Sequence, residues 1–175
     1  MKKERKLSLI FGYIALASGS IWFGAYIARL LTTYQLFEVT DLVLKSYVTG
    51  ENLPAIFQTT IPLVNITFFT YLILIVSFTL FVISSKMKLK ENGWLLIISL
   101  IIFLTLPLET VLMLIDYKLI VIFLNEQFAS TEILRLIKER ITVLSSFPII
   151  LLLSYLSIPY FLVFKPFTIS SNDEN

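Results

Sequence analysis

Three charged side chains lie inside apolar runs that are long enough to cross a bilayer. Glu109 and Asp116 belong to the segment LTLPLETVLMLID of residues 104–116, and Arg29 lies near the end of the first run. A carboxylate in such a place pairs with a cation, faces a hydrated cavity or holds a proton, because an isolated charge there costs at least ~2.5–3.5 kcal/mol. The two acids are seven residues apart and share one helix face.

An ion pair between Arg29 and Glu109 is the leading hypothesis, because Arg29 is the only basic residue within the apolar runs. Asp116 is a competing partner that is expected closer to water. With Gln58 and Asn65 at a comparable depth on the second run, these residues are expected to converge on a polar pocket that opens outward. Two interpretations stay open: polar groups that lock the helix register, or a pocket that binds a ligand or handles protons.

The residue types that are missing exclude several chemistries. The 175-residue chain contains no histidine and no cysteine. It therefore lacks the usual ligands of haem iron, iron–sulfur clusters, zinc and copper, as well as cysteine or histidine nucleophiles and bases. No catalytic residue, cofactor or metal site is predicted, and the chain is not expected to be an enzyme. A formal net charge of only +2, without a basic stripe, argues against nucleic-acid binding.

The composition places these residues in a membrane protein. Hydrophobic residues make up 57% and charged residues 15% of the chain, against roughly 45–50% and 25% in soluble domains. Four runs reach the length of about 20 residues that a membrane helix needs: residues 7–31, 61–84, 94–117 and 141–164. The predicted fold is an all-α integral membrane protein with a bundle of four transmembrane helices, in a single domain over residues 1–175.

The distribution of lysine and arginine predicts the orientation. Eight basic residues lie on the side that holds both termini and the short turn at residues 85–93, and five lie in the two long connections. By the positive-inside rule both termini face the cytoplasm, and the composition suits a bacterial cytoplasmic membrane. A cleaved signal peptide at residues 1–17 is the alternative, disfavoured because the apolar run continues to residue 31.

Both long connections contain an amphipathic pattern, at residues 40–50 and 130–141. Each opens on a residue that can cap a helix, and in the second segment Ile133, Ile137 and Ile141 share one face. We therefore expect a short helix in each outer loop, lying in the membrane interface or over the end of the bundle.

Small residues recur on the first run at multiples of four positions: Gly12, Ser20, Gly24 and Ala28. Such a stripe lets a second helix approach closely, either within the same bundle or from another subunit or a second copy.

The function that these features favour is a non-catalytic accessory or interaction subunit of a membrane complex, with the lipid bilayer and other membrane subunits as partners. The alternative is a small oligomeric transporter or channel with an outward-facing polar pocket around Glu109. The inner halves of the four runs are mostly apolar, which argues against a continuous path.

Overall fold

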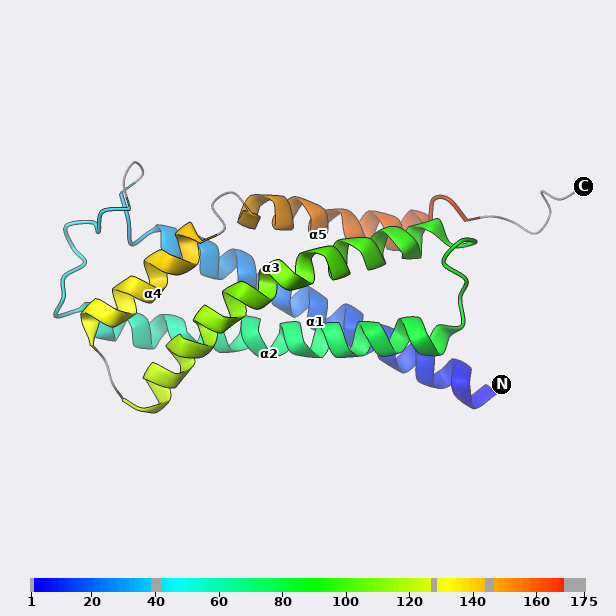
Figure 1. Cartoon of the computed structure of the whole chain (residues 1–175), viewed down its shortest axis with the longest axis horizontal. Helices are drawn as coiled ribbons and strands as arrows, with labels where there is room; N and C mark the ends of the chain where they lie inside the picture. Colours follow the sequence, from blue (N-terminus) through cyan, green and yellow to red (C-terminus); the bar gives the residue numbers. More distant parts are fainter. Residues whose placement is uncertain (1, 39–41, 127–128, 144–146, 169–175) are drawn as a thin grey trace, which may run out of the picture.

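The computed structural model describes residues 2–38, 42–126, 129–143 and 147–168, with side chains from residue 6 onward. Within these ranges the chain forms five helices (Figure 1): α1 (Lys2–Tyr34), α2 (Leu53–Ser85), α3 (Gly93–Leu124), α4 (Ser130–Thr142) and α5 (Phe147–Phe164). The other described residues form turns, connecting segments and isolated β-bridges.

Four of the helices are long and apolar enough to cross a membrane, as the hydropathy pattern predicts: Lys6–Tyr34, Leu53–Ser85, Gly93–Leu124 and Phe147–Phe164. Between 22% and 39% of the residues in their most apolar stretches are buried within the protein, so the larger part of each stretch keeps apolar surface exposed. Exposed apolar surface on this scale is unfavourable in water and is covered by hydrocarbon in a bilayer. The described chain is therefore all-helical and compatible with a multipass membrane protein.

The turn predicted at residues 85–93 separates α2 from α3. The helix α2 ends at Ser85, after which Lys86 adopts a left-handed conformation with φ 55°. Gly93 then opens α3, and its N–H donates to the carbonyl of Phe167 at 3.0 Å. A Cβ atom at position 93 would lie 2.7 Å from the Cβ of Phe167, so this close approach requires glycine.

The fourth predicted span, residues 141–164, is wrong at its start. Ile141 lies in the last turn of α4, whereas α5 begins at Phe147. Ile141 is apolar because α4 is amphipathic and packs this side chain against the core. Hydropathy alone merged the end of an amphipathic helix with the start of a membrane helix, because both present apolar residues there.

Of the two predicted loop helices, one is present and one is not. A helix occupies Ser130–Thr142, but residues 42–50 contain none, and residues 40 and 41 lie outside the described part. The first connection instead folds back on itself: the N–H of Glu38 donates to Val43 O at 2.8 Å and that of Lys45 to Leu36 O at 3.0 Å. These hydrogen bonds within the connection satisfy backbone groups of Val43 and Lys45, which the predicted helix would have satisfied internally.

The helices α1 and α2 pack against each other, and α3 contacts α2, α4 and α5. Figure 1 shows the start of α1, the end of α5 and the turn between α2 and α3 at one end of the molecule, with α4 at the other. At the α4 end, Ile133 and Leu136 are fully buried against a cluster that includes Phe57 and Leu119. This short helix therefore covers the end of the long helices.

Candidate functional site

The main polar contact joins α1, α3 and α4 through three charged side chains. The guanidinium of Arg29 donates two hydrogen bonds to Asp116, from Nη1 to Oδ2 at 2.6 Å and from Nη2 to Oδ1 at 2.5 Å. Arg140 on α4 donates a third, from Nε to Oδ1 at 2.8 Å. Asp116 is 2% exposed, so both cations neutralise a carboxylate that is shielded from water.

The helix α2 also contributes to this contact. Nη1 of Arg29 donates to the hydroxyl of Thr67 at 3.3 Å, and that hydroxyl donates to the carbonyl of Leu63 at 2.9 Å. The bidentate pair and the threonine fix the plane of the Arg29 guanidinium. Four helices are therefore connected through two arginines, one aspartate and one threonine.

Arg140 was not among the residues singled out from the sequence. Its guanidinium lies over the ring of Tyr26, 5.9 Å from the ring centre, while its side chain keeps 11% of its surface exposed. Although burial disfavours the charged form, the carboxylates of Asp116 and Glu109 hold the pKa of Arg140 above its usual value. The sequence carries a signal for it, because Arg140 follows the buried Ile133 by seven residues and so shares its helix face.

The predicted Arg29–Glu109 ion pair is wrong, because Arg29 pairs with Asp116 instead. The prediction placed Asp116 at the water boundary from its position along the helix. In the structure α4 covers this end of α3, so Asp116 is as buried as Glu109, at 2% exposure each. The more peripheral acid therefore became the buried partner of Arg29.

Glu109 lies near this cluster without joining it. Both arginines and Asp116 interact with it electrostatically, but its Oε1 atom has no hydrogen-bond partner among the described residues. Of the other predicted pocket residues, Asn65 is half-buried with its Oδ1 atom unpaired, and Gln58 is exposed. Of the five predicted residues, the charged contact joins Arg29 and Asp116, the competing acid partner expected from the sequence.

Aromatic side chains form a cluster around Trp22. The ring of Trp22 on α1 lies 5.3 Å from that of Tyr26, 5.2 Å from that of Tyr71 and 4.6 Å from that of Tyr155. The hydroxyl of Tyr155 is 3.3 Å from that of Thr105 and also interacts with the hydroxyl of Tyr71, while the hydroxyl of Tyr26 interacts with Arg140. These buried hydroxyls are therefore matched within the bundle.

Two cavities lie near these residues. A small one of about 50 Å³ is lined by Tyr26, Arg29 and Arg140 among others. A larger one of about 230 Å³ lies between α1, α2, α3 and α5 and is lined mainly by apolar side chains. Glu109 lines neither cavity. The small cavity is large enough for water and is lined by two cations, whereas Glu109 is away from it.

The arrangement supplies charge neutralisation and helix-to-helix contact. Among the described residues, no group of three or more acidic side chains is placed to hold a metal ion. Comparison with known proteins gives no match to a protein family, to a curated protein or to a solved structure. The function is therefore inferred from the chain's own residues.

Proposed function

We propose that this chain is a non-catalytic accessory subunit of a membrane complex, in a bacterial cytoplasmic membrane. The four long helices cross the bilayer as one bundle with both termini in the cytoplasm. The excess of lysine and arginine near the termini and the turn at residues 85–93 supports this orientation. The arrangement of α1, α5 and the turn at one end of the molecule is compatible with it (Figure 1).

One observation carries the accessory role: the charged groups of the site are used by one another. Asp116 accepts three hydrogen bonds from the two arginines, and one of these cations also contacts Thr67. A site that binds and turns over a substrate keeps polar groups directed at the place where the substrate binds. Here the same groups hold α1, α3 and α4 together, so the contact acts as a structural lock.

The surface that we assign to a partner lies on α1. Part of the small-residue stripe is already occupied, since a Cβ atom at Gly12 would lie 3.1 Å from the ring of Phe81 on α2. Farther along the stripe, Ser20 and Gly24 are exposed, and a Cβ at Gly24 would meet nothing within 4 Å. With the half-buried Ala28, these positions form a surface of small side chains. One transmembrane helix of a partner subunit can pack closely on it.

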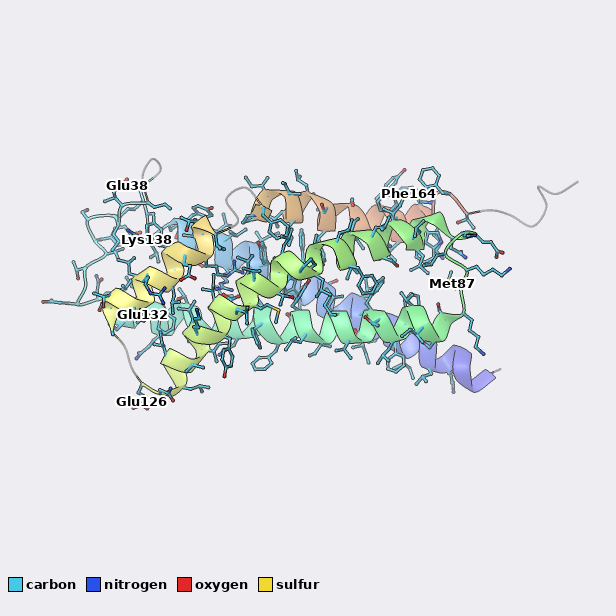
Figure 2. The ribbon with its side chains drawn as sticks, viewed as in Figure 1. Glu38, Met87, Glu126, Glu132, Lys138 and Phe164 are labelled. Carbon is cyan, nitrogen blue, oxygen red and sulfur yellow. The ribbon has the colours of Figure 1, made fainter. Side chains whose placement is uncertain are left out.

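Figure 2 shows charged residues gathered at the α4 end of the molecule. The labelled charged residues Glu38, Glu126, Glu132 and Lys138 lie at the α4 end, and the labelled Met87 and Phe164 lie at the opposite end. The partner surface on α1 lies in the apolar region between these ends. An association within the bilayer is therefore the kind of contact that this surface favours.

The test compares two glycine substitutions in the full-length chain. Gly24→Leu adds a bulky side chain to the proposed surface, and Gly50→Leu adds the same side chain at another glycine with nothing within 4 Å of a Cβ. In mild detergent, native mass spectrometry should show a stoichiometric complex with another membrane protein. We expect Gly24→Leu to dissociate the complex and Gly50→Leu to leave it intact. A wild-type chain that is only monomeric or homo-oligomeric would contradict the proposal.

A transporter or channel is the second candidate, and the unpaired Glu109 carboxylate is the observation that favours it. Under the accessory role, purified protein in liposomes should conduct neither protons nor small cations above the level of empty liposomes. Flux that is present in the wild type and lost in Glu109→Gln would replace the accessory role with this alternative.

A further inference from the structure

We infer that Glu109 is a proton-binding site: a buried, neutral carboxylic acid whose ligand is a single proton. The two acids of α3 differ in their hydrogen-bond partners. Asp116 accepts three charge-assisted hydrogen bonds, whereas the described structure offers Glu109 Oε1 none. The two residues are equally buried, so burial alone does not separate them. Their hydrogen-bond partners do.

An ionised carboxylate without donors is the costly form at this position. The loss of water around a buried charge is repaid only by close counter-charges and by hydrogen bonds to its oxygens. Both guanidiniums direct these bonds to Asp116. A proton on Glu109 removes the charge, and the remaining cost is that of a neutral polar group.

The tyrosine hydroxyls that interact with Glu109 are compatible with a protonated acid. A carboxylic acid presents one O–H donor and one carbonyl acceptor, and a tyrosine hydroxyl also presents one of each kind. The hydroxyls of Tyr26 on α1 and Tyr71 on α2 are buried and interact electrostatically with Glu109. Each can act as donor or acceptor toward a protonated carboxyl group.

The charged neighbours explain why Glu109 and not Asp116 takes the proton. The groups that face Glu109 are Tyr26 and Arg29 from α1, Tyr71 from α2, Asp116 from α3 itself, Arg140 from α4 and Tyr155 from α5. Of these, Tyr26 and the two cations line the cavity of about 50 Å³, which has room for a water molecule. Glu109 is 2% exposed and does not line that cavity, so its own charge would be poorly solvated.

Infrared spectroscopy of the full-length protein in lipid vesicles tests the inference. A protonated carboxyl group absorbs above the amide I band and an ionised one below it. At about pH 6 the exposed carboxyl groups are ionised, so a remaining band above amide I reports a buried acid. We expect this band in the wild type, and we expect Glu109→Gln to remove it.

Two outcomes would overturn the inference. A wild-type spectrum without the band would show that Glu109 is ionised, and a band that survives in Glu109→Gln would assign the proton to another residue. Glu109→Gln imitates the shape of the neutral acid and should fold, so its helical circular dichroism controls for misfolding. The result does not depend on the accessory role, because no partner subunit is present in the vesicles.

Discussion

Replacement of Arg29 by methionine should destabilise the protein by about 3–5 kcal/mol, the range for removing one partner of a buried ion pair. The structure supports this magnitude, because Arg29 provides two of the three hydrogen bonds to Asp116. A charge-assisted hydrogen bond contributes roughly 1.5–3 kcal/mol. The bond from Arg140 remains, so the carboxylate keeps one partner. Asp116→Leu should cost more, since it removes all three bonds and leaves two cations unpaired.

A double-mutant cycle separates the pair from its surroundings. The double variant Arg29→Met, Asp116→Leu leaves only Arg140 without its carboxylate, and that side chain lines a cavity that is large enough for water. We therefore expect the double variant to be more stable than the sum of the single effects predicts, by about 3 kcal/mol, at the upper end of measured couplings. The same cycle with Glu109→Gln in place of Asp116→Leu should give a coupling below ~0.5 kcal/mol.

The assay is reversible unfolding in mixed micelles, with a denaturing detergent as the variable and circular dichroism as the signal. The reasoning is refuted if the Arg29–Asp116 coupling falls below ~0.5 kcal/mol, the usual limit for independent sites. A coupling between Arg29 and Glu109 that exceeds the one between Arg29 and Asp116 would restore the pair predicted from the sequence.

Three further predictions concern the ends of the molecule. Leu136→Ala should lower the free energy of unfolding by about 2–5 kcal/mol in the same assay, because this fully buried side chain anchors α4; a loss below about 1 kcal/mol would show that α4 does not pack there. Gly93→Ala should lower the thermal midpoint, because the added carbon would lie 2.7 Å from Phe167, and an unchanged midpoint would contradict that close approach. The hydrogen bond from Arg135 holds the pKa of Glu132 below its usual value, so its small stabilising effect is present at neutral pH and is lost as the pH falls below about 4. Unfolding midpoints at acidic pH should show this loss in the wild type but not in Glu132→Gln.

The helices themselves were largely predictable, because the requirement is local. A run of apolar residues that is long enough to cross hydrocarbon must satisfy its backbone hydrogen bonds internally, so composition and length predict a helix. The turn before Gly93 was also predictable, since polar residues and an Asn-Gly pair interrupt two such runs. The start of the fourth helix was not, because an amphipathic helix that packs on the core has apolar residues at its end as well.

The candidate site was predictable only in part. The sequence identified Arg29 and both acids of α3 as buried charges that need partners, because a charge inside an apolar run is costly wherever the chain folds. It did not identify Arg140, although the spacing from Ile133 places the two on one face of α4. That spacing becomes informative only when this face is known to be buried.

The sequence by itself determined the class of protein and the four apolar helices. It also identified Arg29, Glu109 and Asp116 as charges that are costly to bury. Each of these follows from the transfer of side chains and backbone out of water. The tertiary structure decided which charges meet. An ion pair needs two side chains at the same level on neighbouring helices, and that level depends on how α1, α3 and α4 pack. By covering the end of α3, α4 buried Asp116, gave it a second cation and left Glu109 without a donor among the described residues.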